Sequence, residues 1–264
     1  MVMKINFTFV LLFISALAFS QEPQTYQSNS TYKKNKIKLR RWYTGTNKAL
    51  TIITYYDTEG RLIKYENQPT LTGSQTTTYY VYDETGKLVS MVDTIKNGKA
   101  DMEKIKQLES MGLKINYDAK KEKKKPKFEI GAYELNYSGN ELIKIISFNP
   151  DNSIRFVDLY QNNRRINIRE WYNSAGAIYR QDTAVYEKPN QKIKYSGCDK
   201  GTYGKCWTYN YSHEFDKEGK IIKMVEYEKN GHDELTTFYY NDKGLLIKAL
   251  SKLRPGFFEY EFYE

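Results

Sequence analysis

Apolar and aromatic runs alternate along the chain with short polar turns, and one turn pattern recurs. This turn motif is an aromatic residue, Asn or Asp, two variable residues, Gly, one further residue and a branched aliphatic residue. It predicts a three-residue hairpin loop, in which Asp or Asn caps a type I turn and Gly adopts the left-handed conformation of a G1 bulge. Its clear copies begin at Tyr56, Tyr82, Tyr172, Phe215 and Tyr240, and their glycines are Gly60, Gly86, Gly176, Gly219 and Gly244.

The turn motif also predicts which residues face each other across a hairpin. Tyr56 is expected opposite Leu62, and Asp57 opposite Arg61 beside the turn. The copies at Tyr82 and Phe215 pair an aromatic with an aliphatic residue and an acid with a base in the same way. A copy at Tyr137 is one residue shorter, and a two-residue turn at 139–140 still pairs Tyr137 with Leu142. Each such pair contributes a few tenths to about 1 kcal/mol.

Weaker copies fall between the clear ones, so that turns recur every 11 to 13 residues. That spacing is the length of one strand and one turn, and it predicts an antiparallel meander. In the segment after Lys220, alternation places Ile221 and Met224 on opposite faces, so both faces are partly apolar. The predicted fold is therefore all-β, a long twisted or curled sheet rather than a sandwich with one dry side.

A short helix is expected to interrupt the sheet. Met102, Ile105 and Leu108 recur at helical spacing, with Asp101 as the cap and Gly112 as the stop. The basic run at 120–127 has too little apolar content to fold by itself and is expected to be a mobile loop. The insertion spans 100–127 of a β domain at 45–264, and a segment at 21–44 supplies an extension and the first strand.

The first 20 residues have the pattern of a secretory signal peptide. Lys4 precedes an apolar run from about Phe7 to Phe19, and small residues favour cleavage near Ser20 and Gln21. The run is too short to cross a bilayer, which takes about 20 apolar residues, and no later segment comes near that length. The mature protein is therefore expected to be secreted or periplasmic, without a transmembrane segment.

Charge is distributed unevenly along the chain. The formal net charge is +9, and the segment from Ile95 to Ile130 holds eleven Lys against six acidic residues, 11 − 6 = +5. A basic surface is typical of proteins that bind nucleic acid or anionic surfaces. Because a secreted protein meets little nucleic acid, that partner is not expected, and a solvated charged insertion is the simpler interpretation.

Cys198 and Cys206 are the two cysteines, and a loop with glycines separates them. In an exported chain this spacing favours a local disulfide, worth about 2 to 3 kcal/mol in the chain-entropy model. A metal site is the alternative, but His213 and His232 are the only histidines and the spacing is not that of a zinc site. No metal or cofactor is expected.

The segments from Tyr55 to Ile63 and from Tyr80 to Val89 resemble the tyrosine-aspartate repeats of bacterial Rhs/YD-repeat proteins. The resemblance extends loosely over 45–250 and implies β-sheet shells or scaffolds, with no catalytic residues to transfer. This chain is short, irregularly spaced and lacks a large toxin-like C-terminal domain. The MORN-like repeats of antitoxin-type proteins are a weaker match. The end of the leader is similar to those of exported Bacteroidetes proteins.

Motifs of catalysis are missing from the sequence. There is no GxSxG, HExxH, phosphate-binding loop or dinucleotide turn, so no catalytic residue is proposed and the protein is expected not to be an enzyme. Both histidines lie beside turns, where an exposed polar residue is common. Paired carboxylates of the glycosidase kind stay open, although cross-strand charge pairing accounts for most of the acids.

Aromatic surfaces remain as candidate binding sites. Tryptophan and tyrosine can stack on sugars or anchor a protein partner, although they also serve as cross-strand aromatics of a sheet. The leading hypothesis is a binding or scaffold module for protein or polysaccharide of the cell envelope. The alternatives are an enzyme acting on anionic polysaccharide and an immunity or antitoxin-like protein. The candidate binding residues are Trp42, Trp171, Trp207, Tyr80 and Tyr239.

Overall fold

The computed structural model describes residues 29–69, 73–110, 127–188, 191–200, 204–228, 233–252 and 255–264. Within them, sixteen strands and the helices α2 and α3 form. The first half comprises α2 (Asn29–Lys34), β1 (Ile37–Thr44), β2 (Ala49–Tyr56), β3 (Leu62–Asn67), β4 (Ser74–Tyr82), β5 (Leu88–Asn97), α3 (Met102–Ser110), β6 (Phe128–Ser138), β7 (Glu141–Phe148) and β8 (Ile154–Gln161). The second half comprises β9 (Ile166–Tyr172), β10 (Ile178–Lys188), β11 (Gln191–Asp199), β12 (Cys206–Phe215), β13 (Ile221–Glu228), β14 (Glu234–Tyr240), β15 (Leu246–Ser251) and β16 (Gly256–Phe262).

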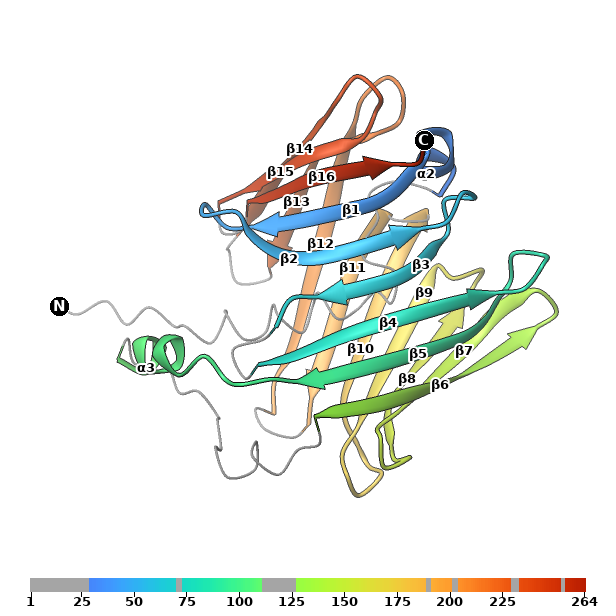
Figure 1. Cartoon of the computed structure of the whole chain (residues 1–264), viewed down its shortest axis with the longest axis vertical. Coiled ribbons are helices and arrows are strands. Elements are labelled where there is room, and N and C mark those ends of the chain that lie inside the picture. Colours follow the sequence, from blue (N-terminus) through green and yellow to red (C-terminus); the bar gives the residue numbers. More distant parts are fainter. Residues whose placement is uncertain are drawn as a thin grey trace.

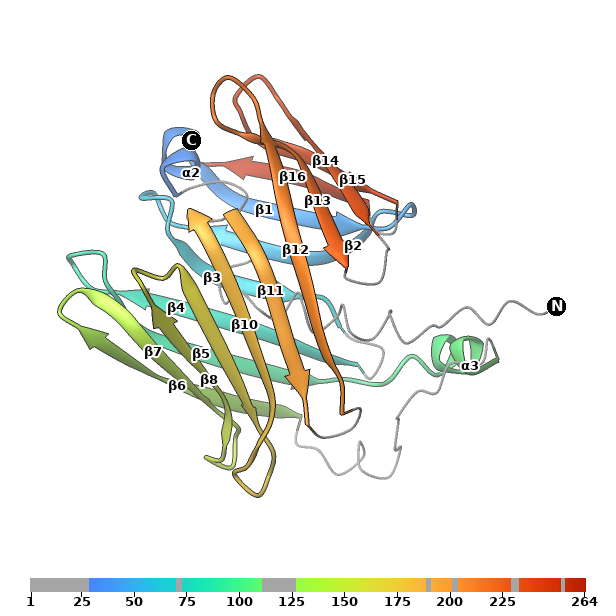
Figure 2. The same cartoon turned by 180° about the vertical axis from the view of Figure 1, so that it is seen from behind.

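The strands follow one another in chain order and every pair is antiparallel, but the prediction of a long twisted or curled sheet is wrong. β1 pairs with both β2 and β16, so the sheet closes into a barrel. The closing register places Trp42 opposite Phe258 and Thr44 opposite Gly256. Figures 1 and 2 show β1–β7 as one wall and β9–β12 as the facing wall. Closure was missed because it joins segments at opposite ends of the chain, which no local pattern reports.

The turn motif folds as its spacing predicts. The five glycines of the clear copies all have positive φ, between 73° and 83°. In the first copy, the Gly60 amide donates to the Asp57 carbonyl, and the Asp57 amide donates to the Arg61 carbonyl. Tyr56 lies opposite Leu62, and Tyr137 lies opposite Leu142 through the shorter turn. The motif is therefore a hairpin with a defined register.

A β-bulge follows each clear copy of the turn motif and changes which residues share a face. The register shifts between Glu214 and Phe215, so Ile221 and Met224 pack into one cluster rather than on opposite faces as strict alternation predicts. Shifts at the same place of the β2–β3 and β4–β5 hairpins bring Leu62 together with Tyr65, and Leu88 with Met91. The extra residue of a bulge moves every following side chain to the other face, which explains the error.

The two faces of the sheet differ in burial. One face, the packed face, carries the aromatic clusters and buried charged residues such as Asp158 and Arg169. The other, the open face, carries residues such as Tyr79, Leu235 and Tyr239, each more than 40% exposed. Side chains converge on the concave side of a closed sheet, so the packed face lies inside the barrel and the open face outside.

Tyrosine hydroxyls connect neighbouring hairpins at one end of the barrel. Tyr82 donates to the Leu62 carbonyl over 2.9 Å, and Tyr137 donates to the Leu88 carbonyl. In both bonds the aromatic residue of one turn motif reaches the aliphatic residue of the preceding one. Two further bonds of this kind are Tyr240 to Ile221 at 2.8 Å and Tyr260 to Leu246 at 2.7 Å. The abundant tyrosines therefore pack their rings and satisfy main-chain carbonyls together.

The helices lie at opposite ends of the barrel. α2, which the sequence did not predict, precedes β1 near the C-terminus, whereas α3 overlaps the expected helix and lies beyond the end of β5 (Figure 1). We call these ends the α2 end and the α3 end. The signal-peptide region, the basic run up to 126 and His232 lie outside the described residues. Among the described helices, none is both long and apolar enough to cross a membrane.

The cysteines lie directly opposite each other on adjacent strands. Cys198 of β11 and Cys206 of β12 are cross-strand partners and form a disulfide. The bond closes the β11–β12 hairpin at the α3 end. No group of three or more His, Cys, Asp or Glu side chains that could hold a metal ion occurs in the described part of the chain.

A basic cavity at the α2 end of the barrel

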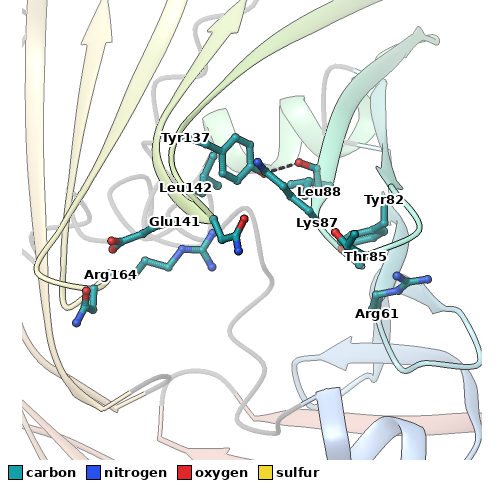
Figure 3. A pocket seen from close by; sticks show the side chains of 12 residues that line it. Arg61, Tyr82, Thr85, Lys87, Leu88, Tyr137, Glu141, Leu142 and Arg164 are labelled. Atoms are coloured by element: carbon teal, nitrogen blue, oxygen red, sulfur yellow. Dashed lines mark hydrogen bonds between the residues drawn. The ribbon is translucent and has the colours of Figure 1, made fainter.

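Several hairpin turns surround a cavity of about 900 Å³ at the α2 end. The turns between β2 and β3, β4 and β5, β6 and β7, and β8 and β9 all lie at this end, because alternate turns of a meander share an end. Figure 3 shows the lining side chains around the space. They are Arg61, Tyr82, Thr85, Gly86, Lys87, Leu88, Tyr137, Asn140, Glu141, Leu142, Asn163 and Arg164. Three are cationic and one, Glu141, is acidic, which makes the lining electropositive.

Lys87 and Arg164 line the cavity without a carboxylate partner in the described structure. The Lys87 ammonium lies 4.0 Å from the centre of the Tyr137 ring and donates to the Gly139 carbonyl over 3.4 Å. The Arg164 guanidinium lies 5.3 Å from the centre of the Tyr160 ring. Aromatic faces attract cations but do not neutralise them. Both side chains therefore keep their full charge available to a ligand.

The loop that carries Arg164 has an unusual backbone. Asn162, Asn163 and Arg164 have φ of 51°, 53° and 63°, so three consecutive residues are left-handed. Asn tolerates this conformation, whereas an arginine there costs about 1–2 kcal/mol. Residues held in strained conformations cluster at functional sites. The tight loop between β8 and β9 therefore turns through three left-handed residues and carries Arg164 as the last of them.

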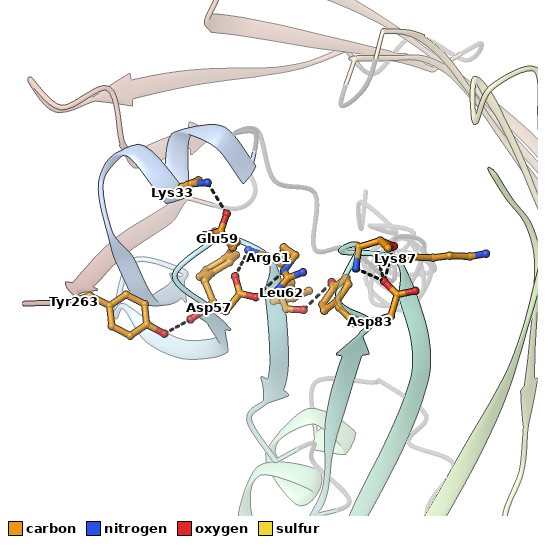
Figure 4. A network of polar contacts seen from close by, with 11 residues as sticks. Lys33, Asp57, Glu59, Arg61, Leu62, Asp83, Lys87 and Tyr263 are labelled. Carbon is orange, nitrogen blue, oxygen red and sulfur yellow. Dashed lines mark hydrogen bonds and ion pairs between the residues drawn. The ribbon is translucent and has the colours of Figure 1, made fainter. Parts of the chain in front are cut away.

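Arg61 differs from the other two cations because it is neutralised. Its Nε donates to Asp57 over 2.7 Å, and its guanidinium lies 5.0 Å from the centre of the Tyr82 ring (Figure 4). Asp83 caps its own turn in the same way, accepting from the Lys87 amide at 2.9 Å. The Asp residues of these turns are thus occupied by the hairpins, and they leave the Lys87 ammonium unpaired.

Tyr137 of the cavity is neutral at physiological pH. Burial raises the pKa of Tyr137, and the nearby Arg164 opposes the shift. Its hydroxyl is already committed to the Leu88 carbonyl. The cavity can therefore offer two unpaired cations, the amides of Asn140 and Asn163, and aromatic surface. This combination binds anions and flat polar rings, and it contains no pair of carboxylates for acid–base chemistry.

Two of the predicted binding residues, Trp171 and Trp207, meet at a different place. They lie on β9 and β12 on the packed face, and the Arg180 guanidinium is 5.9 Å and 5.1 Å from their rings. Trp171 Nε1 donates to Asp182 over 3.0 Å, and Arg180 Nε donates to the same carboxylate over 2.7 Å. Asp182 is fully buried, so this cluster is part of the barrel interior.

The structure does not bring the other predicted binding residues to these two. Trp42 stacks on Phe258 with ring centres 6.1 Å apart, and Tyr80 is buried in the aromatic cluster of the packed face. Tyr239 lies on the open face, with Lys248 5.5 Å from its ring. None of these five residues lines the cavity. His213 is half-buried beside Phe215, and burial lowers its pKa.

The cavity residues were missed because each belongs to a turn that the sequence explains fully as a hairpin. Lys87 follows the glycine of a turn motif, where a basic residue is expected to pair across the turn. Arg164 lies in one of the weaker copies, in the run Asn162–Asn163–Arg164–Arg165. Two asparagines before two arginines are the one signal in the sequence that could have indicated a left-handed, basic loop.

Comparisons with known proteins do not identify a family. No protein-family model matches the chain, and no curated protein matches it. Among solved structures, the chain is similar to a porin-like protein from Bacteroides uniformis ATCC 8492 at 10% identity and a TM-score of 0.37. The match covers 85% of this chain and 98% of that chain. A likeness this distant carries no argument about fold or function.

Proposed function

We propose that this chain is a non-enzymatic binding protein of the cell envelope or extracellular space, and that the cavity at the α2 end holds an anionic saccharide. The observation that carries the proposal is the pair of cations, Lys87 and Arg164, that line the cavity with Tyr137 and have no carboxylate partner in the described structure. A carboxylated sugar would place its acid group between the cations and its ring against the tyrosine.

Charged side chains on the outside of the barrel are typical of a surface that faces water. A strand that faces lipid needs an apolar band about 25 Å tall, and Lys or Arg at its centre costs about 2–4 kcal/mol. Here charged residues occupy the middle of the open face of many strands. Arg41 of β1 pairs with Glu261, and Lys64 pairs with Glu66 at 2.7 Å. The disulfide supports an oxidising compartment outside the cytoplasm.

Titration calorimetry with trigalacturonate, and with maltotriose as the neutral probe, tests the proposal. We expect the wild-type protein to bind trigalacturonate. The double variant Lys87→Gln with Arg164→Gln should bind it at least about tenfold more weakly, because the loss of even one charge-assisted contact has an effect of that size. Affinity should also fall as salt rises. Chromatography of the ligand after incubation should show no cleavage.

The matched control changes two cations of the open face, Lys194→Gln with Lys248→Gln, and so keeps the same net charge as the cavity variant. It should bind like the wild type. Equal affinity of both double variants, or equal binding of maltotriose, would contradict a specific anion site. Cleavage of trigalacturonate would replace the binding function with the enzyme alternative.

A further inference from the structure

The buried acids inside the barrel each have an arginine partner. Asp158 accepts two hydrogen bonds of 2.6 Å from Arg169, and both residues are at most 1% exposed. Asp93 pairs with Arg155 at 2.8 Å, and Asp182 pairs with Arg180 at 2.7 Å. Such pairing is the usual condition for burying a charge. The inner wall therefore neutralises its own carboxylates.

Arg40 of β1 breaks this rule. Its side chain lies on the packed face, the residue is 3% exposed, and no carboxylate is within ion-pairing distance of it in the described chain. Thr54, Tyr65, Thr78 and Asp93 follow it directly across the next four strands. Since neighbouring strands are about 4.8 Å apart, the main chain at Asp93 is about 19 Å from that at Arg40, measured along the sheet. A buried guanidinium without a counter-charge is costly for the fold.

What Arg40 contacts instead is an aromatic box. Its Nη1 donates to the Tyr32 hydroxyl over 2.9 Å, and its guanidinium lies 5.9 Å and 5.7 Å from the rings of Tyr32 and Phe258. The Tyr32 ring lies 4.4 Å from that of Tyr56, and Tyr260 packs against the same cluster. Arg40 Nε is buried and has no hydrogen-bond partner in the described structure. One donor of the fork is thus left unused.

Tyr32 comes from α2, a helix of six residues. Lys33 pairs with Glu59, but both side chains are more than half exposed, which makes the pair weak (Figure 4). Asn35 Nδ2 reaches the Lys243 carbonyl at 3.4 Å. The Tyr32 side chain, fully buried, therefore anchors α2 at the barrel end. Burial raises the pKa of Tyr32, so its hydroxyl is a neutral acceptor and does not balance the charge of Arg40.

We propose that Arg40, Tyr56, Tyr260 and Phe258 form a second binding site, for a ligand that carries a carboxylate on an aromatic ring, and that α2 is a strap whose Tyr32 occupies this site until the ligand displaces it. A carboxylate can accept from two guanidinium donors at once, Nη2 together with Nε or with Nη1, whereas the phenol accepts from Nη1 alone. The site shares no residue with the lining of the basic cavity, so it does not rest on the proposed function.

Removal of the strap's side chain tests the site. Tyr32→Ala should bind benzoate at least about tenfold more tightly than phenol or acetate, because benzoate alone supplies both ring and acid. Adding Arg40→Met should abolish this preference. Equal binding of benzoate and phenol by Tyr32→Ala would overturn the proposal. The variant with Lys87→Gln and Arg164→Gln should keep benzoate binding, which separates this site from the basic cavity.

Thermal unfolding distinguishes a binding role of Arg40 from a structural one. Arg40→Met removes an unpaired charge and should leave the melting temperature unchanged or higher. The control, Arg169→Met, leaves Asp158 buried without a partner and should lower it. A loss for Arg40→Met as large as that for Arg169→Met would show that Arg40 serves the fold and would overturn the proposal.

Displacement of the strap can be measured in the wild-type chain. Trypsin cleavage after Lys33 and Lys34, followed by mass spectrometry, should accelerate with saturating benzoate and not with phenol. Arg40→Met should remove the effect of benzoate. Unchanged cleavage at both lysines in the presence of benzoate would overturn the displacement of α2. The cleavage experiment uses the wild-type chain, so it tests the displacement of α2 even if Tyr32→Ala does not fold.

Discussion

Gly197 lies where the inner wall leaves no room for a side chain. A Cβ built there would lie 2.2 Å from Asp182 Oδ1 and 2.5 Å from Cζ2 of Trp207, both held by the interior cluster. We therefore expect Gly197→Ala to lower the free energy of unfolding by about 1–3 kcal/mol, the usual cost of overpacking. Urea denaturation measures it. Ser196→Ala, one position away on the open face, is the control, and an equal effect of both would contradict the crowding.

Lys192 should make the stability of the folded protein depend on pH. Burial lowers its pKa to about 8, with Glu226 opposing the shift, and its ammonium lies 5.5 Å and 5.6 Å from the rings of Tyr195 and Tyr211. The ordinary lysine pKa is about 10.4. Between these values the unfolded chain binds more protons than the folded one, so the contribution of Lys192 to stability rises with pH.

The comparison with Lys192→Met isolates this contribution. We expect the free energy of unfolding of the wild type, minus that of the variant, to increase from pH 7.5 to pH 9.5. Urea denaturation at several pH values in this window measures the difference, in which the other titrating groups cancel. A difference that stays constant with pH would mean that the Lys192 ammonium remains hydrated in the folded protein.

At the scale of elements, the hydroxyl bonds between hairpins should carry measurable stability. Tyr240 joins the β14–β15 hairpin to the Ile221 carbonyl of the preceding one. Tyr240→Phe keeps the ring and removes the bond, so we expect a loss of about 0.5–1.5 kcal/mol in the free energy of unfolding. Tyr239→Phe, next in sequence but on the exposed open face, should change little. A similar loss in both variants would argue against the bond.

The elements are also where sequence analysis was most successful. Asp57 and Gly60 act within five residues of each other, so the hairpin follows from local chemistry. The bulge after each turn follows from the same loop, yet its effect on Ile221 and Met224 went unnoticed because strict alternation was assumed. α2 was missed because a helix of six residues has too little length for a periodic pattern.

At the scale of the whole molecule, closure can be tested with an engineered disulfide. Arg41 of β1 and Glu259 of β16 are direct cross-strand partners. In a closed barrel, Arg41→Cys with Glu259→Cys should form an intramolecular bond, because facing Cβ atoms in a sheet lie about 4.5–5.5 Å apart. Alkylation and mass spectrometry under non-reducing conditions measure it. Arg41→Cys with Glu170→Cys, which places the second thiol on β9, should stay reduced.

Neither the closure nor the basic cavity could be predicted from the sequence. Each depends on residues brought together from separate turns: Lys87 and Arg164 belong to the β4–β5 and β8–β9 hairpins, with the β6–β7 hairpin between them. Local patterns determine how each hairpin bends, but the curvature that accumulates over sixteen strands decides which turns face one another. The same holds for Arg40, whose lack of a counter-charge becomes visible only when its neighbours are known.

The seam between β1 and β16 has a consequence for how the molecule forms. Every other pairing joins strands that are adjacent in sequence, so the meander can grow hairpin by hairpin with cheap loop closures. The pairing of β1 with β16 must wait for the far terminus, and until then one edge of each of these strands stays exposed to other chains. Completing the ring therefore carries the highest contact order of the fold, and we expect the slowest and most aggregation-prone stage of refolding there.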